Sequence, residues 1–207
     1  MEAAVFDIDG TLVDSFAADA ELYLAAVTQV LGISGVNEEW AHYRHVTDQG
    51  ILREIMEAHG IARDPALFDA TKQRFVELLT GHIGKHGPFR EIPGAIAYVS
   101  RLLESRGHYV AYATGAWRES ALIKLESAGL PTRGVHLSSS NEFEDRVSIM
   151  RGALSAAPSK IGKITYYGDA VWDQKAVREL GWEFVAIGAK LDGLPDYHGL
   201  AVEPWPT

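Results

Sequence analysis

The chain has 207 residues, with 19 lysines and arginines against 28 aspartates and glutamates, and a formal net charge of −9. Hydrophobic residues make up 47% of the chain and charged residues 23%, which are the proportions of a folded protein and exclude a disordered or collagen-like one. The acidic balance argues against nucleic acid and anionic membranes as partners, so a phosphorylated ligand needs a local positive site or a bound cation. The chain has no cysteine, which excludes disulfides, thiolate zinc sites and cysteine nucleophiles.

The first residues, MEAAVFDIDG, lack the basic opening, the apolar run and the small-residue cleavage site of a signal peptide. No segment reaches the roughly 18 consecutive apolar residues that a membrane span requires. We therefore expect a soluble, cytoplasmic protein with no membrane partner. Its length allows one domain and a modest second module.

The first predicted element is a buried strand over residues 3–8, an apolar run that ends in acidic residues. It is followed by residues 15–91, in which apolar residues recur at helical spacing and no convincing strand occurs. Residues 80–88 are rich in glycine and are predicted to form a flexible return linker. Before that linker we predict three helices, over residues 16–31, 49–58 and 65–79.

From residue 92 onwards, helical patterns alternate with short apolar runs that are typical of buried strands. The predicted helices cover residues 92–105, 119–128, 146–156 and 173–180. The predicted strands cover residues 109–113, 134–137, 164–167 and 183–187. This alternation predicts an α/β fold with a parallel sheet that is covered by helices on both faces. The sheet domain would comprise residues 1–14 and 92–207, with residues 15–91 as an inserted helical module.

Polar residues follow three of the predicted strands, at the edge of a parallel sheet where ligands bind. The first strand runs into Asp7 and Asp9, which face the same way because they are two residues apart. Thr114 and Gly115 follow the second predicted strand, and Asp169 follows the fourth. Clustered carboxylates repel one another unless a cation or a proton intervenes, and their hard oxygens favour Mg²⁺. The sequence therefore predicts a magnesium site at this edge.

Four motifs together resemble the haloacid dehalogenase-like hydrolases, in the branch of phosphoglycolate phosphatase-like and beta-phosphoglucomutase-like enzymes. They are FDIDGTLVDS at residues 6–15, ATG at 113–115, a basic residue that opens the helix after the third strand, and YGDAVWD at 167–173. The first of these motifs is highly specific. The resemblance implies a Rossmann-like core with a helical cap, residues 15–91, inserted after the first strand.

The resemblance also implies a role for each residue at this edge. Asp7 would be the nucleophile that forms an aspartyl-phosphate, and Asp9 would be the general acid and then the base. Thr114 and Gly115 would bind the oxygens of the phosphoryl group. The residues that would hold Mg²⁺ are Asp7, Asp9 through its backbone carbonyl, Asp169 and Asp173.

One position departs from the family pattern. The family normally has a lysine, often followed by proline, after the third strand, and this chain has Glu-Asp-Arg at residues 144–146. Arg146 stands at the predicted start of a helix and could offer two N–H donors to phosphate or to Asp7. Lys160 and Lys163 are its rivals, but they precede the fourth strand and would lie at the opposite edge of the sheet.

Other polar residues have two interpretations. Thr47 and Gly50 belong to a polar turn that opens a helix of the insert, where caps of this family present substrate-recognition groups; solvated capping is the alternative. Asp173 either supports the metal or forms the N-cap of the helix that starts there. Asp14 and Ser15 are predicted to cap the first helix of the insert.

The resemblance implies an enzyme, a Mg²⁺-dependent phosphoric monoester hydrolase that acts on a small phosphorylated metabolite. A phosphomutase would share every core residue, and a non-catalytic protein that senses a phosphorylated metabolite would keep the fold. Haloacid dehalogenase activity is less favoured, since that chemistry has no need of Asp9. Phosphonate cleavage would need a Schiff-base lysine in the insert, where Lys72 and Lys85 have no supporting pattern. No natural substrate and no oligomeric state are predicted.

Overall fold

A computed structural model describes residues 1–158 and 160–200. In this part of the chain, five strands form one parallel sheet in the order β3-β2-β1-β4-β5. Their bounds are β1 Glu2–Phe6, β2 His108–Ala113, β3 His136–Ser138, β4 Lys163–Gly168 and β5 Glu183–Ala186. Strand β1 lies at the centre, with Glu2 opposite both His108 of β2 and Lys163 of β4. The predicted α/β fold with a parallel sheet is confirmed.

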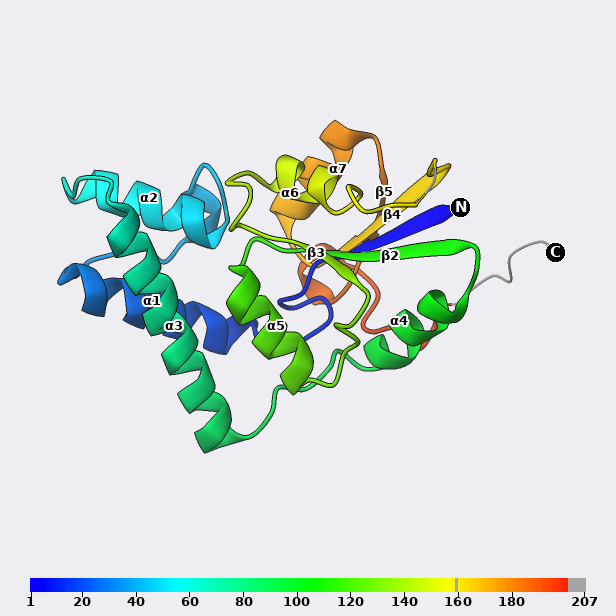
Figure 1. Cartoon of the computed structure of the whole chain (residues 1–207), viewed down its shortest axis with the longest axis horizontal. Helices are drawn as coiled ribbons and strands as arrows, with labels where there is room; N and C mark the ends of the chain where they lie inside the picture. Colours follow the sequence, from blue (N-terminus) through cyan, green and yellow to red (C-terminus); the bar gives the residue numbers. More distant parts are fainter. Residues whose placement is uncertain (159, 201–207) are drawn as a thin grey trace.

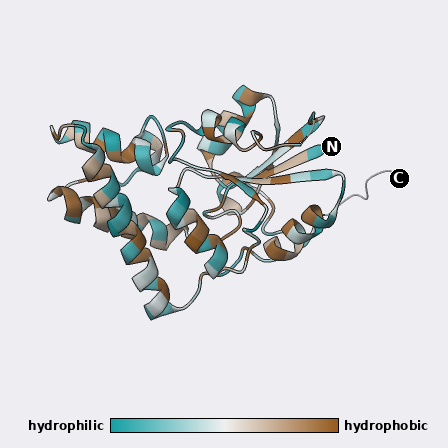
Figure 2. Cartoon of the chain, viewed as in Figure 1, coloured by the Kyte–Doolittle hydropathy of each residue, from teal (hydrophilic) through white to brown (hydrophobic). Residues whose placement is uncertain are grey.

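Helices cover both faces of the sheet (Figure 1). They are α4 Ala95–Glu104, α5 Arg118–Ser127, α6 Arg146–Gly152 and α7 Val171–Leu180. Because side chains alternate along a strand, Phe6 packs with α4 and α5 on one face, whereas Val5 packs with α6 and α7 on the other. In Figure 2 these helices carry both hydrophobic and hydrophilic residues, as expected for helices with one buried side.

Three helices of the insert lie beside the sheet rather than on either of its faces (Figure 1). They are α1 Phe16–Leu31, α2 Asp48–Ala58 and α3 Pro65–His86, with a short 3-10 helix, Trp40–His42, between the first two. Tyr23, Leu52 and Phe75, one from each helix, belong to one apolar cluster. Trp117 joins that cluster from the start of α5. The insert therefore has its own core, with one aromatic side chain supplied by the sheet region.

The predicted flexible linker over residues 80–88 is wrong, because α3 continues to His86. A Cβ at Gly81 or Gly84 would meet nothing within 4 Å, so neither glycine is required by packing. Each costs a helix about 1 kcal/mol relative to alanine, which is why the sequence suggested a loop. Tertiary packing outweighs this cost, since Leu79 is fully buried and the ring of His82 stacks on Phe89.

Helix α3 has 22 residues, enough to span about 30 Å. Charged residues, including Lys72, Arg74 and Glu77, interrupt its apolar residues. Among the described helices, none is both long enough and apolar enough to cross a membrane.

We expect the packing of α5 on the sheet to be a major source of stability. Leu125 of α5 is fully buried, whereas Leu103 of α4 is 40% exposed. Leu125→Ala should lower the free energy of unfolding by about 2–5 kcal/mol, because it removes buried methyl groups and leaves a cavity. Leu103→Ala is the matched control and should cost less than about 1 kcal/mol. Urea denaturation of both variants measures the difference, and equal losses would contradict this packing.

Candidate active site

The carboxyl end of β1 carries the first acidic pair. The N–H of Asp7 donates to the carbonyl oxygen of Tyr167 at 2.9 Å, which extends the β1–β4 ladder by one residue and fixes the Asp7 backbone. The Asp7 residue is 4% exposed. Beyond Asp9 the chain turns at Gly10, whose φ is +79° and whose N–H donates to the carbonyl oxygen of Val13 at 2.8 Å. This turn keeps both carboxylates at the edge of the sheet.

Residues that follow the neighbouring strands lie at the same edge. Thr114 follows β2, and its N–H donates to the carbonyl oxygen of Ser138 at 3.0 Å. Asp169 follows β4 and is buried. A cavity of about 80 Å³ opens here between the sheet and the helical insert. The predicted site residues that line it are Asp7, Asp9, Thr47, Thr114, Gly115, Arg146 and Asp169.

Asp7, Asp169 and Asp173 form a buried acidic cluster. One carboxylate oxygen of each residue lies within 4.8 Å of the others. Burial, together with the charge of Asp173, raises the pKa of Asp7 well above its ordinary value, although Arg146 opposes the rise. Burial raises the pKa of Asp173 to about 6 and also raises the pKa of Asp169. The three carboxylates repel one another when they are ionised.

The acidic cluster fits a divalent metal ion. Its donors are hard carboxylate oxygens, which Mg²⁺ prefers, and their spacing allows them to converge on one ion. Oδ2 of Asp173 is buried without a hydrogen-bond partner, so it has an unused acceptor at this place. A bound cation would satisfy this oxygen and relieve the repulsion among the carboxylates.

Arg146 lies against the acidic cluster from the first residue of α6. Its Nη1 is 3.2 Å from Oδ1 of Asp7, and its Nε is 3.3 Å from Oδ1 of Asp173. The helix begins here because the side chain of Asp145 accepts the N–H of Ser148 and caps it. The rival Lys163 pairs with Glu183 at the opposite edge of the sheet.

Asp173 does not cap α7, contrary to one of its two predicted interpretations. The helix begins two residues earlier than predicted, and its N-cap is Ala170. Asp173 thus lies in the first turn, where its carboxylate is fully buried and accepts the hydroxyl of Tyr166 at 3.4 Å. This position directs the side chain towards Arg146 and the acidic cluster.

The two neighbours of Asp9 were missed by the sequence analysis. Ser15 was expected to cap α1, but its hydroxyl donates to Oδ1 of Asp9 at 2.5 Å and makes no cap hydrogen bond. Nζ of Lys124 lies 2.7 Å from each oxygen of Asp9 and donates to Asp19 at 2.6 Å. A signal existed in the sequence, since Lys124 follows Ala121 by three residues and therefore falls on the same helical face as this apolar residue.

A third cation near the site was also missed. Lys190 belongs to the short 3-10 helix Ala189–Leu191 after β5. Its Nζ donates to Oδ2 of Asp169 at 2.6 Å and lies 3.6 Å from the centre of the Phe16 ring. No motif marks this lysine, because it contacts the site from a loop distant in sequence.

The helical insert contributes Thr47 and Asp48 to the cavity. Oγ1 of Thr47 accepts the N–H of Gly50 and caps α2, and its hydroxyl donates to the carbonyl oxygen of Glu144. The N–H of Asp48 donates to the carbonyl oxygen of Gly115 at 2.8 Å. Gly50 does not line the cavity among the described residues; its N–H is used in the cap, and a Cβ there would meet His45 at 2.8 Å. Capping is therefore the role that the contacts of Gly50 support.

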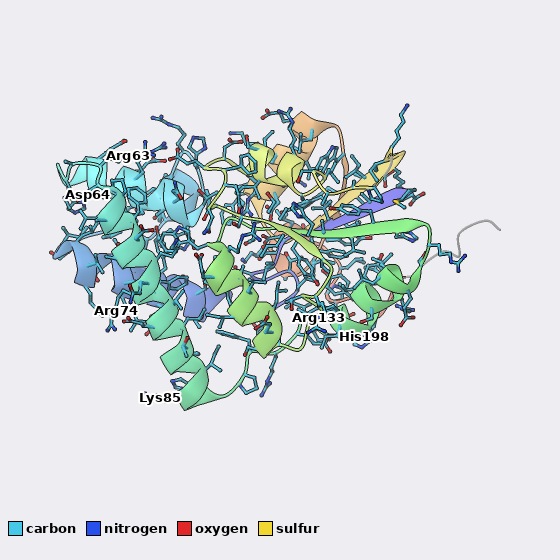
Figure 3. All side chains as sticks on the ribbon, in the orientation of Figure 1. Arg63, Asp64, Arg74, Lys85, Arg133 and His198 are labelled. Atoms are coloured by element: carbon cyan, nitrogen blue, oxygen red, sulfur yellow. The ribbon has the colours of Figure 1, made fainter. Side chains whose placement is uncertain are left out.

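The two lysines of the insert lie outside this cavity. Lys72 pairs with Asp69 and with Glu119 of α5. Lys85 lies at the C-terminal end of α3, away from the sheet (Figure 3). Neither is placed to form a Schiff base with a ligand held at Asp7, which argues against phosphonate cleavage.

Comparison with known families agrees with this geometry. Residues 4–178 match the family described as haloacid dehalogenase-like hydrolase. The chain belongs to the haloacid dehalogenase-like hydrolase family. The match covers most of the chain, and it includes every acidic residue of the cluster, the insert and the strands from β1 to β4.

Solved structures share the fold of this haloacid dehalogenase-like hydrolase. A hydrolase from Pseudomonas syringae is 16% identical with a TM-score of 0.72, over 94% of this chain and 88% of that one. CbbY from Rhodobacter sphaeroides, solved in complex with phosphate, is 17% identical with a TM-score of 0.71, over 96% and 91%. A predicted phosphoglycolate phosphatase from Haemophilus somnus is 16% identical with a TM-score of 0.62, over 91% and 85%. No curated protein matches this sequence.

Gly10 tests the packing of the acidic edge. Its φ is +79°, and a Cβ there would lie 2.3 Å from Oδ2 of Asp169. Gly10→Ala should therefore displace Asp169 and weaken Mg²⁺ binding by about 10- to 100-fold, as measured by calorimetry. Gly32→Ala is the matched control, since Gly32 has a φ of +65° but nothing within 4 Å of a Cβ. It should share the backbone strain of about 1–2 kcal/mol and keep the wild-type affinity. Equal affinities in both variants would contradict the arrangement.

Proposed function

We propose that this chain is a Mg²⁺-dependent phosphatase that hydrolyses a small phosphate monoester through an aspartyl-phosphate on Asp7. The observation that supports this most strongly is the position of Asp7. Its buried carboxylate faces a cavity that also presents Thr114, Gly115 and Arg146. A nucleophile and groups that bind phosphoryl oxygens thus converge on one small volume.

The first step is attack by a carboxylate oxygen of Asp7 on phosphorus. A bond forms between Asp7 and phosphorus while the ester P–O bond breaks, and the leaving oxygen takes a proton from Asp9. Water then attacks the same phosphorus, gives a proton to Asp9 and releases phosphate from Asp7. The two steps consume one water and restore both carboxyl groups.

Arg146, Thr114 and Gly115 bind the phosphoryl oxygens during this transfer. The guanidinium of Arg146 carries a positive charge towards Asp7, where negative charge accumulates on the transferring group. Gly115 allows close approach of the backbone, because a Cβ there would meet the carbonyl oxygen of Val46 at 2.8 Å and Nη2 of Arg146 at 3.3 Å.

The residues that would hold Mg²⁺ are the side chains of Asp7, Asp169 and Asp173 and the backbone carbonyl of Asp9. When bound, Mg²⁺ supplies charge neutralisation for the phosphoryl group and for the acidic cluster. This requirement reconciles the net charge of −9 with a phosphate ligand.

Residues 15–91 would act as a cap that closes the cavity and excludes bulk water. Several hydrogen bonds and ion pairs hold it against the sheet region. Asp48 bonds to the backbone of both Gly115 and Trp117, and Thr47 donates to Glu144. Arg53 and Arg63 also pair with Glu144, so this one residue connects several parts of the cap to the loop before α6.

The known neighbours support a small phosphorylated ligand. CbbY was solved with phosphate, and another neighbour is a predicted phosphoglycolate phosphatase. The described lining of the cavity contains carboxylates and one arginine, with no basic stripe of the kind that nucleic acids need.

Replacement of the nucleophile tests the reaction. Asp7→Asn should abolish release of phosphate from 4-nitrophenyl phosphate in Mg²⁺, because the amide cannot attack phosphorus. We expect the rate of phosphate release to fall by at least about 1000-fold. A malachite green assay for phosphate measures this rate. Asp14→Asn, at an exposed position near the same strand, is the matched control and should keep full activity.

Three outcomes of this assay are distinguishable. Full activity in Asp7→Asn would refute the mechanism. Binding of phosphate by the wild type without turnover would identify a sensor of the same fold. Asp7 can be phosphorylated with a radiolabelled phosphoryl group. Transfer of this group to a sugar phosphate faster than to water would identify a phosphomutase.

The cap side of the cavity predicts a preference in substrate charge. The described residues that the insert contributes to the lining include Asp19 and Asp48 and no lysine, arginine or histidine. A second anionic group on the substrate would therefore find no positive partner on this side, because the ammonium of Lys124 is already paired with Asp19 and Asp9 and does not line the cavity. Glycerol 3-phosphate should have a kcat/KM at least about 10-fold above that of 3-phosphoglycerate, which corresponds to about 1.4 kcal/mol. Dihydroxyacetone phosphate, which has no charged group besides its phosphate, is the control, and a preference for 3-phosphoglycerate would contradict this interpretation of the lining.

A further inference from the structure

Lys124 is a fully buried lysine in the last turn of α5. It shares its helical face with the apolar residue Ala121, which packs in the core between α5 and the sheet. A buried ammonium without partners would cost several kcal/mol, so its retention here requires strong compensating interactions. The contacts of its Nζ supply them.

Nζ of Lys124 binds two carboxylates from different parts of the chain. It lies 2.7 Å from each oxygen of Asp9, which follows β1, and 2.6 Å from Oδ1 of Asp19 in α1. Burial alone would lower the pKa of Lys124, but Asp19 and Asp9 more than offset this effect and the pKa is raised. The lysine is therefore a fixed positive charge between the sheet and the insert.

Asp9 is held from two sides by these contacts. Ser15 donates to Oδ1 at 2.5 Å, while Lys124 reaches both oxygens. A carboxylate with donors at both oxygens has little freedom to rotate about its last bond. The described residues that line the cavity include Asp9 and Asp19 but not Lys124. Lys124 thus acts on the cavity through its partners rather than by contact with a ligand.

We propose that Lys124 is the positioning residue for Asp9, which fixes the carboxyl group that exchanges a proton with the leaving oxygen and with water. This inference rests on the proposed phosphatase function. The second contact, with Asp19, couples the position of Asp9 to α1, so that Asp9 is correctly oriented when the insert is docked. Misplacement of a reacting group by about 1 Å can cost about 100-fold in rate.

Loss of Lys124 should affect the two steps of the reaction differently. With a leaving group that departs without a proton, such as 4-nitrophenolate, formation of the aspartyl-phosphate does not need Asp9. Hydrolysis of that intermediate still needs Asp9 as the base. A variant that loses the position of Asp9 should therefore release nitrophenol quickly once and then stall.

The experiment is rapid-mixing kinetics of Lys124→Met in Mg²⁺ with 4-nitrophenyl phosphate and with benzyl phosphate, which is similar in size but has a poor leaving group. With 4-nitrophenyl phosphate we expect a burst approaching one nitrophenol per enzyme at nearly the wild-type rate. The steady state that follows should be about 100-fold slower than in the wild type. With benzyl phosphate the first step should itself be about 100-fold slower, without a burst.

Two control variants separate positioning from general damage. Lys72→Met removes another lysine that links the insert to α5, through Glu119, and should leave both steps unchanged. Asp19→Asn keeps the ion pair between Lys124 and Asp9 and loses only the link to α1, so its steady-state rate should fall less than that of Lys124→Met and no burst should appear. If Lys124→Met fails to fold, Lys124→Met combined with Asp19→Asn removes the stray carboxylate and should give the burst instead.

The presence or absence of a burst distinguishes a positioning role of Lys124 from a structural one. A burst confined to variants that lack Lys124 supports positioning of Asp9. A uniform loss in folded Lys124→Met with both substrates and no burst would overturn the proposal and leave Lys124 as a structural residue. Absence of turnover in the wild type would instead refute the phosphatase function, so the two failures are distinguishable.

Discussion

The repulsion among carboxylates at one edge of the sheet is the constraint on which the rest of this structure depends. The parallel register of β1 and β4 brings Asp7 and Asp169 together, and the first turn of α7 adds Asp173. Burial makes each charge more costly, as the raised pKa values of these groups indicate. Such an edge is stable only with positive charges nearby, and the surrounding elements supply them.

Each cation near the edge has a different acidic partner. Arg146, from α6, pairs with Asp7 and Asp173, and Lys190, from the loop after β5, pairs with Asp169. Lys124, from α5, pairs with Asp9. Three elements that pack on different sides of the sheet therefore converge on one edge. The docking of α5, of α6 and of the loop after β5 is consequently tied to the charges of the acidic residues with which their cations pair.

The sequence allowed the sheet and the acidic residues to be predicted because both follow from local patterns. An apolar run followed by acids marks the end of a buried strand, and the parallel topology then places Asp7 and Asp169 at one edge. The range of α1 was predicted to the residue, since its periodicity is uninterrupted. Lys124 and Lys190 were missed because their partners are distant in sequence. The length of α3 was underestimated because propensity weighs Gly81 and Gly84 but not the packing of Leu79 and His82.

The insert covers the loop that follows β2 and also provides hydrogen-bond partners for its backbone. The carbonyl of Gly115 accepts the N–H of Asp48, and the N–H of Trp117 donates to the Asp48 carboxylate at 2.8 Å, so both ends of this turn are bonded to α2. Trp117 is also buried in the core of the insert. Undocking of the insert would leave these backbone groups without partners and expose the indole ring. The same hydrogen bonds stabilise the conformation of the loop that faces Asp7 and the docking of the insert. The loop therefore becomes ordered and the insert docks in a single equilibrium.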